Sequence, residues 1–167
     1  MSRRIPSSAK FAFVVAMASV IALVDQLTKE AAISSLTPNL RVPVLGDVLG
    51  WYLTYNDSAA FSLGFGITWI FTIISSVALV FVLSRAHRMQ TTVWLFMAGC
   101  LSGGVLGNLI DRLTRPPAFG SGMVVDFIQI PFGFPIFNLA DCFITITMVA
   151  VAVRVALGDK VGGVAHA

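Results

Sequence analysis

The chain has 167 residues, of which 57% are hydrophobic and only 11% are charged, with a net charge of +3. Soluble domains carry charge on about a quarter of their residues, so this composition excludes an ordinary water-soluble globular protein. The length and the apolar content together predict a single membrane domain that comprises residues 1–167.

Four stretches are long and apolar enough to cross a hydrocarbon core, which takes about 20 helical residues. The sequence therefore predicts an all-α membrane protein with spans at residues 11–27, 67–84, 92–110 and 136–157. The first span also has features of a secretory signal, because Arg3 and Arg4 precede an apolar run. Asp25 and Lys29 lie where a cleavage region would be small and neutral, so we interpret this segment as the first helix.

The basic residues predict the orientation of the spans in the membrane. With four spans, both termini share a side with residues 85–91, and that side holds seven of the eleven Lys and Arg residues. Both termini are therefore expected in the cytoplasm. No basic stripe interleaved with aromatic residues indicates a nucleic-acid partner. Seven of the eight acidic residues fall on or near the outer face, where we expect the chemistry: Asp25, Glu30, Asp47, Asp57, Asp111, Asp126 and Asp141.

The two outer segments are expected to form a small β platform. Residues 48–55 and 123–130 are rich in strand-favouring side chains. Residues 113–122 contain consecutive prolines and two glycines, which predict a mobile outer loop. Irregular backbone near a bilayer needs protein or water to satisfy its polar groups, so these segments are expected to pack together over a cavity.

Asp126 and Asp141 are the most informative pair. The first lies in a strand-like run and the second opens the fourth span on the same outer face, with fourteen residues between them. Two close carboxylates share a proton and titrate as a unit, so one can activate a water while the other protonates a carbonyl oxygen. The simpler alternatives are a solvated loop carboxylate for Asp126 and helix capping with Asn138 for Asp141. Capping does not exclude catalysis.

Other polar residues cluster at the outer ends of the spans. Asp25 and Lys29 lie four residues apart and are predicted to pair, as a simple ion pair or as an anchor of the platform. Asn108, Asp111 and Arg112 lie within about one turn of the third span, where polar groups are costly. Arg112 is a candidate partner for Asp111, for the aspartate pair, for a substrate carbonyl or for a lipid phosphate.

Two further features precede or line the spans. Asn56 comes before the second span, where it would cap the helix or hold an extended peptide backbone. Gly99, Gly103 and Gly107 lie on one face of the third span, a spacing typical of closely packed membrane helices.

Other catalytic classes have less support. His87 and His166 are both placed on the cytoplasmic side, away from most acids, so neither a Cys–His pair nor a metal site is expected. A transporter would continue its acidic groups across the bilayer as a relay, and no such path is visible. A non-enzymatic scaffold would explain the glycines but not the clustered acids.

Five blocks of the sequence resemble the lipoprotein signal peptidase (signal peptidase II) family and occur in that family's order. They are DQLTK at 25–29, NDSAAF at 56–61, GGVLGNLIDR at 103–112, VVDF at 124–127 and FNLAD at 137–141. Blocks spread from the first span to the fourth cover nearly the whole chain outside its tails. One departure is Ser58, where the family usually has Gly, and a positive φ there would strain the serine.

The resemblance implies an aspartic endopeptidase of the bacterial inner membrane. The family removes signal peptides from prolipoproteins that carry a diacylglyceryl group, cleaving before the lipidated cysteine, and it needs no cofactor or metal. Its catalytic aspartates map onto Asp126 and Asp141. Its residues that contact substrate or the inhibitor globomycin map onto Asn56, Asn108, Asp111, Arg112 and Asn138, and Asp25 and Lys29 map onto supporting positions.

The same resemblance predicts how a substrate is bound. The apolar signal helix would enter sideways between the spans, with its diacylglyceryl chains remaining in membrane lipid. The scissile bond would then lie at the outer membrane–water boundary, with residues 113–122 closing over it. We expect a monomer.

Overall fold

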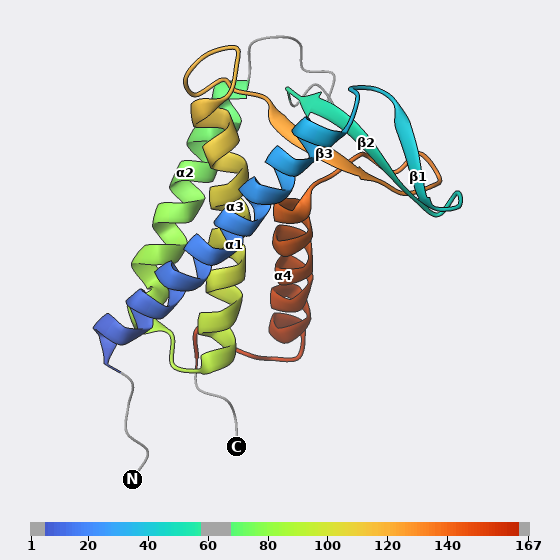
Figure 1. Ribbon diagram of the computed structural model, residues 1–167. Helices are drawn as coiled ribbons and strands as arrows, with labels where there is room; N and C mark the ends of the chain where they lie inside the picture. The colour runs from blue at the N-terminus through green and yellow to red at the C-terminus, as the bar shows by residue number, and fades with distance from the viewer. Residues whose placement is uncertain (1–5, 58–67, 164–167) are drawn as a thin grey trace.

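The computed structural model describes residues 6–57 and 68–163 as four long helices and one small sheet (Figure 1). The elements in chain order are α1 Ser7–Ser35, β1 Arg41–Leu45, β2 Leu49–Asn56, α2 Thr68–Arg85, η2 Ala86–Arg88, α3 Thr92–Thr114, β3 Val124–Gln129 and α4 Leu139–Ala156. Within these residues, four helices are long and apolar enough to cross a membrane. The predicted fold of four long apolar helices with a small β platform is confirmed.

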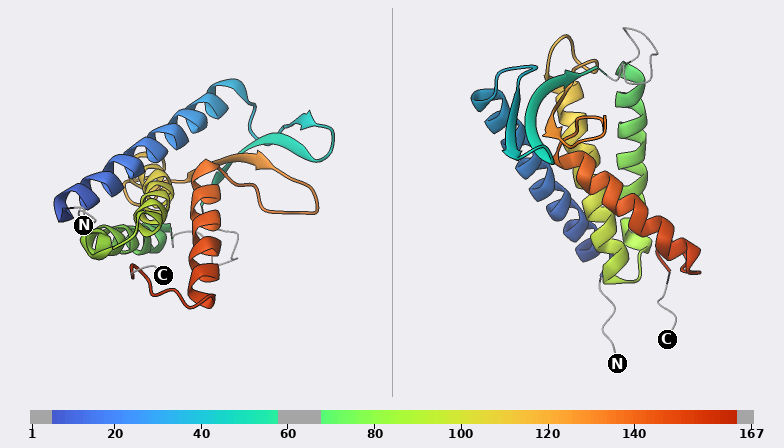
Figure 2. Two further views of the ribbon diagram at one scale, coloured as in Figure 1. Left: turned by 90° about the horizontal axis from the view of Figure 1, so that it is seen from below. Right: turned by 90° about the vertical axis from the view of Figure 1, so that its right-hand side faces the viewer.

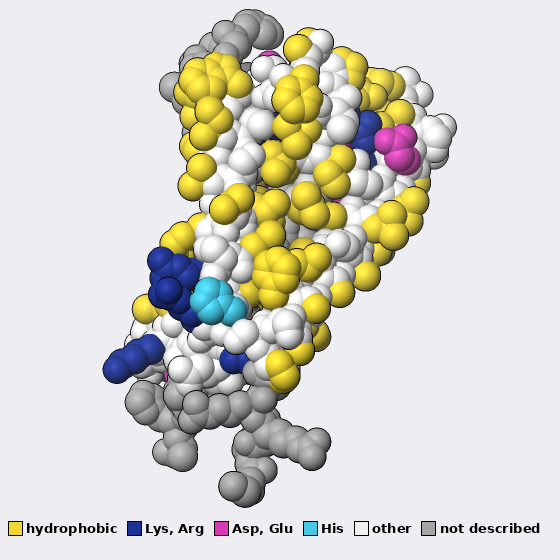
Figure 3. Space-filling view, turned by 90° about the vertical axis from the view of Figure 1, so that its left-hand side faces the viewer, with side chains coloured by type: hydrophobic (Ala, Val, Ile, Leu, Met, Phe, Trp, Pro, Cys, Tyr) yellow, Lys and Arg dark blue, Asp and Glu magenta, His cyan; other side chains and the backbone are white. Residues whose placement is uncertain are grey.

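Helix α3 is the central element of the bundle. It packs against α1, α2 and α4 and holds most of the buried helical residues. The other three helices expose apolar side chains outward, and the space-filling view shows such side chains over one face of the molecule (Figure 3). The outward side chains of α2 include Trp69, Ile70, Ile73, Ile74, Val77 and Val80. Such a surface is compatible with lipid and not with water, so the bundle is built for a hydrocarbon environment.

Three glycines of α3 allow α1 to approach closely, as their spacing predicts. A Cβ atom at Gly99 would meet the Met17 side chain, and one at Gly103 would lie 2.6 Å from the Ile21 Cβ atom. A Cβ at Gly107 would lie 2.6 Å from the Asp25 carboxylate. The contact therefore follows one face of each helix, four residues at a time.

Replacement of Gly103 by Ala is expected to lower the melting temperature of the protein in detergent. The added methyl group has no room against Ile21, so the helices must separate, at a cost of about 1–3 kcal/mol. The matched control is Val93→Leu, which adds one methylene at an exposed position of the same helix. Equal melting temperatures for the two variants would show that α1 and α3 are not held this closely.

The sheet is antiparallel in the order β1–β2–β3. Thr54 pairs with Asp126, and Asn56 pairs with Val124, so Asn56 at the end of β2 lies close to Asp126 on β3. Figure 2 shows the sheet projecting beside one end of the bundle. The two predicted strands, 48–55 and 123–130, are confirmed, and β1 is an addition.

Helix α1 is longer than the predicted span, which ended at residue 27. Its final turns pack against the sheet, where Ala32 forms a buried cluster with Leu53, Val125 and Phe127. Because this extension buries apolar surface on the sheet, the helix continues to Ser35. Helix α3 likewise runs to Thr114, so the predicted outer loop at 113–122 begins two residues later than expected.

The beginning of α1 and the end of α4 lie at the same end of the bundle, opposite the sheet (Figure 1). The turn between α2 and α3 is at that end too, since η2 packs against α1. This arrangement agrees with an even number of spans.

Candidate active site

Asp126 is held in the middle of β3, with its side chain directed into the protein. The residue is 1% exposed. One carboxylate oxygen accepts a hydrogen bond from Asn56 Nδ2 at 2.9 Å, and the other accepts one from Asn138 Nδ2 at 2.6 Å. Asn56 comes from the neighbouring strand β2, so the sheet register brings this donor to Asp126. The solvated-loop interpretation of Asp126 is therefore wrong.

Asp141 lies in the first turn of α4 and completes a capping box. Asn138 Oδ1 accepts from the Asp141 backbone N–H at 3.0 Å, and Asp141 Oδ2 accepts from the Asn138 backbone N–H at 3.2 Å. The predicted capping is confirmed. It uses only one oxygen of Asp141, because Oδ1 accepts a hydrogen bond from Asn108 Nδ2 at 2.7 Å. The cap fixes the carboxylate without closing it off from chemistry.

Two asparagine amides join the aspartates into one network. Asn138 Nδ2 donates to Asp126 and also to Asn108 Oδ1, at 3.1 Å. Asn108 in turn donates to Asp141. An amide nitrogen has two hydrogens, so Asn138 uses both of them here. Asp126 and Asp141 thus lie in one hydrogen-bond network, as their predicted proximity requires. Asn108 in this network comes from α3, and Asn138 is the residue before α4.

The surroundings of Asp126 favour its protonated form. Burial raises the pKa of Asp126 from 3.8 to about 7, and the negative charge of Asp141 adds to this rise. The hydrogen bonds from Asn56 and Asn138 and the positive charge of Lys29 lower the pKa in part. A carboxyl group with a pKa near neutrality can donate a proton at physiological pH, whereas an ordinary aspartate cannot.

Lys29 is fully buried next to Asn108, one of the two asparagines that join Asp126 to Asp141. Its ammonium group lies 2.8 Å from Asp25 Oδ2 and 2.7 Å from Asp111 Oδ2, and it donates to Asn108 Oδ1 at 2.9 Å. These three partners match its three hydrogens. The predicted pairing of Asp25 with Lys29 is confirmed, but the pair lies inside the protein and not at an exposed helix end. Through Asn108, the ammonium group fixes the amide that donates to Asp141.

Asp25 and Asp111 connect the helices to the segments that carry the catalytic candidates. Asp25 Oδ1 accepts from the backbone N–H of Ala140 at 2.9 Å, in the first turn of α4. Asp111 Oδ2 accepts from the backbone N–H of Val125 at 3.1 Å, next to Asp126 on β3. Asp111 is fully buried, and this favours support of the fold over contact with a bound peptide.

Three other members of this network are absent from the predicted site residues. Gln26 Nε2 and Arg115 Nε donate to Asp111 Oδ1 at 3.0 and 2.8 Å. Arg115 also pairs with Glu30 at 2.8 Å. Gln26 belongs to the first of the five sequence blocks, which was the only available signal. Arg115 and Glu30 are 85 residues apart in the sequence, and no local pattern connects them.

Arg112 lies between α2 and the aspartates. Its guanidinium carbon is 5.7 Å from the centre of the Phe71 ring, and it interacts electrostatically with Asp141, Asp111 and Asp126. Asn56 and Arg112 therefore belong to the same site as the aspartate pair. Ser58 lies outside the described residues. Among residues 6–57 and 68–163, no three His, Cys, Asp or Glu residues are grouped so that they could hold a metal ion.

Comparison with known proteins gives consistent matches. Residues 17–157 match the signal peptidase (SPase) II family, peptidase family A8. A lipoprotein signal peptidase of Leifsonia xyli is 46% identical over 132 residues, which are 79% of this chain and 61% of that protein. One from Mycobacterium leprae is 35% identical over 149 residues, which are 87% of this chain and 74% of that protein. The chain thus spans less than two thirds of the Leifsonia relative.

A solved structure supports the same relationship. It is described as a bacterial membrane enzyme determined by the in meso method, and it superimposes with a TM-score of 0.75 at 26% sequence identity. The match covers 85% of this chain and 91% of that one. The family model extends from α1 to the end of α4 and so includes both aspartates and both bridging asparagines. This chain belongs to the signal peptidase II family.

Proposed function

We propose that the protein is an aspartic endopeptidase that removes signal peptides from diacylglyceryl-modified bacterial prolipoproteins. One observation carries the proposal most directly. Two carboxylates, one with a pKa raised to about 7, are joined by Asn108 and Asn138 at the sheet end of a four-helix bundle. This is the arrangement that activates water without a cofactor or metal.

In the proposed reaction Asp141 acts as the general base and Asp126 as the general acid. Ionised Asp141 removes a proton from a water molecule as its oxygen attacks the carbonyl carbon before the lipidated cysteine. Protonated Asp126 donates its proton to the carbonyl oxygen. The tetrahedral intermediate then loses the cysteine amine, which takes a proton from Asp141, and Asp126 recovers its proton from the new carboxyl group.

Four polar side chains position the reacting groups in this proposal: Asn56, Asn108, Arg112 and Asn138. Asn56 donates a hydrogen bond to one carboxyl oxygen of Asp126, and Asn138 donates to the other. Together the two amides fix the orientation of this carboxyl group. The guanidinium of Arg112 would stabilise negative charge on the peptide carbonyl. A globomycin-type inhibitor would occupy the same place as the scissile peptide.

The placement in the membrane follows from the same proposal. The chain belongs to a family of multi-pass membrane proteins with bacterial members. We propose that the sheet end faces the extracytoplasmic side and both termini the cytoplasm, because five of the nine Lys and Arg residues in 6–57 and 68–163 lie at the end opposite the sheet. One monomer, comprising a single domain, contains both aspartates.

The deciding experiment is a gel-shift assay with purified protein in detergent. The substrate is a prolipoprotein carrying the diacylglyceryl group, and its matched control is the same prolipoprotein without the lipid. We expect cleavage of the lipidated form alone. Failure of folded protein to cleave a substrate that a related lipoprotein signal peptidase does cleave would contradict the proposal and favour transport or a scaffold role.

The rate of cleavage is expected to fall as the pH rises above about 7. Asp126 must be protonated to act as the acid, and its raised pKa means that it is protonated below about 7 and ionised above it. Above that pH the rate should fall about tenfold per pH unit. Measurement of kcat/KM between pH 5 and 9 tests this limb.

Replacement of Asn56 by Leu should move the same limb to higher pH. The Asn56 hydrogen bond stabilises the ionised form of Asp126, so its loss raises the pKa further. A lower rate with an unmoved limb would show that Asn56 acts on substrate alone and not on the acidity of Asp126.

A further inference from the structure

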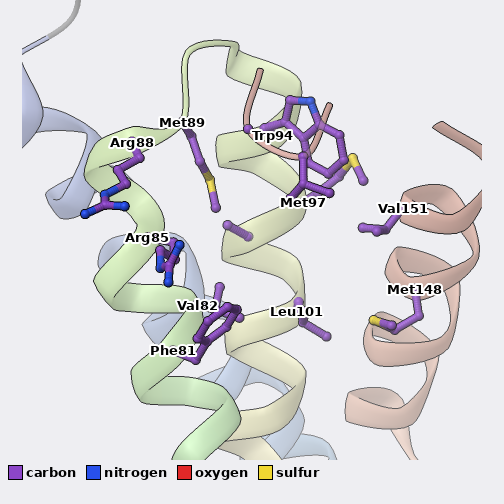
Figure 4. Close-up of a pocket in the computed structure, with 13 residues that line it drawn as sticks. Phe81, Val82, Arg85, Arg88, Met89, Trp94, Met97, Leu101, Met148 and Val151 are labelled. Carbon is purple, nitrogen blue, oxygen red and sulfur yellow. The ribbon is translucent and has the colours of Figure 1, made fainter. Parts of the chain in front are cut away.

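A cavity lies at the end of the bundle opposite the sheet, away from the aspartates. It has a volume of about 460 Å³ and is enclosed by the ends of α2, α3 and α4 together with the segment after α4 (Figure 4). Volumes of about 300–1,000 Å³ are typical of small-molecule sites. Gln90 donates a backbone hydrogen bond to Gly162 O at 3.1 Å, which holds the segment after α4 against the cavity.

The cavity walls are almost wholly apolar and adaptable. Three of the six methionines of the chain line it, Met89, Met97 and Met148, and Trp94 lies beside them. Methionine side chains adjust to an irregular or flexible ligand better than branched ones do. Phe81 and Met148 are about half exposed, so the cavity opens between α2 and α4 onto the lipid-facing surface.

Two arginines form one rim of this cavity. Arg85 ends α2, and Arg88 lies in η2 one turn further on. The Arg85 guanidinium carbon is 4.9 Å from the centre of the Phe81 ring, which places the charge directly over an apolar wall. In residues 6–57 and 68–163, no carboxylate forms an ion pair with either arginine. The acid at this end, Asp159, is paired with Arg154 at 2.5 Å.

We propose that this cavity binds an anionic glycerophospholipid of the membrane, with an acyl chain between α2 and α4 and the phosphate on Arg85 and Arg88. An apolar wall under an uncompensated pair of cations fits a molecule with a long apolar chain and a negative head. Basic pockets between helices at a membrane surface bind such headgroups. The cavity opens between α2 and α4, so an acyl chain can enter it from the side.

A signal peptide is the competing occupant, and its charge disfavours it. Signal peptides carry positive residues before their apolar segment. That positive end would lie at the same membrane face as Arg85 and Arg88 and would be repelled by them. The paired arginines therefore favour the phospholipid.

Native mass spectrometry in detergent tests the proposal with two probes, phosphatidylglycerol and phosphatidylcholine of equal chain length. The parent should retain phosphatidylglycerol in preference, and Arg85→Gln/Arg88→Gln should lower this preference, by about fivefold for each arginine. Lys10→Gln removes a cation from the same end outside the cavity and should leave the preference unchanged. Leu101→Trp adds bulk to the cavity wall and should lower retention of both lipids.

Only variants whose melting temperature equals that of the parent are compared. If the double variant is less stable than the parent, the two single arginine variants are used in its place. Equal retention of the two lipids by the parent would overturn the proposal. An unchanged preference in the double variant, or an equal loss in Lys10→Gln, would do the same. Displacement of phosphatidylglycerol by a synthetic signal peptide would assign the cavity to substrate. None of these outcomes depends on peptidase activity.

Discussion

Replacement of Asp126 by Asn is expected to lower the rate of prolipoprotein cleavage by about 10³-fold or more while the protein stays folded. Asparagine has the same shape but cannot donate the proton that the carbonyl oxygen requires. Asp141→Asn should have a similar effect, because the two residues act as one unit and the double variant should lose little more than either single one. The rate is measured by gel-shift on the lipidated prolipoprotein.

The stability of Asp126→Asn gives an independent check on the raised pKa. The folded-state pKa of about 7 lies above the ordinary 3.8, so the native protein binds the proton more tightly than the unfolded chain. Stability of the parent therefore falls as the pH rises from about 4 to about 7, and the asparagine variant lacks this loss. Melting temperatures at pH 5 and pH 8 should diverge in favour of the variant at pH 8.

If the melting temperatures of the parent and Asp126→Asn differ by the same amount at pH 5 and pH 8, the pKa of Asp126 is not raised in the folded protein. Asp47→Asn is the matched control, since Asp47 is an exposed carboxylate on the same side of the protein. It should change neither the rate nor the pH dependence of stability. Cleavage by Asp126→Asn at the parental rate would remove Asp126 from the mechanism while leaving the peptidase itself possible.

Replacement of Lys29 by Met is expected to destabilise the protein by about 3–5 kcal/mol. The ammonium group is the cation shared by Asp25 and Asp111, and both carboxylates are fully buried. Without it, Asp25 loses its cation and Asp111 keeps only Arg115, while both carboxylates remain side by side away from water. The measurement is the melting temperature in detergent, together with the yield of folded protein from membranes.

A compensating substitution separates the charge effect from general damage to the core. Lys29→Met/Asp25→Asn removes one of the stranded charges and keeps an oxygen for the backbone N–H of Ala140. It should recover part of the lost stability. Lys10→Met is the matched control, because Lys10 lies near the exposed beginning of α1 and takes no part in the buried network. An equal loss in both double and single variants would contradict the proposed role of the charge.

The spans and the aspartate pair could be predicted from the sequence because both leave local signals. Apolar runs predicted both ends of α2, α3 and α4 to within four residues, and the Asn138–Asp141 spacing indicated the cap. The end of α1 was predicted eight residues early because Asp25 and Lys29 were interpreted as interfacial. Lys29 also pairs with Asp111 on α3, a partner that only the folded chain brings near.

The remaining features depend on contacts between distant segments. Strand β1 is short, contains Pro43 and has one neighbour, β2, so its sequence lacks the alternation of a buried strand. Arg115 reads as the start of a proline-rich loop, yet it joins Asp111 to Glu30. The orientation of both bridging asparagine amides is likewise set by their partners and not by their neighbours in sequence.

The capping box links activity to the order in which the chain is synthesised. Asn138 and Asp141 lie at the start of α4, which leaves the ribosome after their partners on β2, α3 and β3. A chain with only three helices inserted has one of the two carboxylates and lacks an amide that orients it. In the proposed mechanism, proteolysis therefore begins only when α4 is in place.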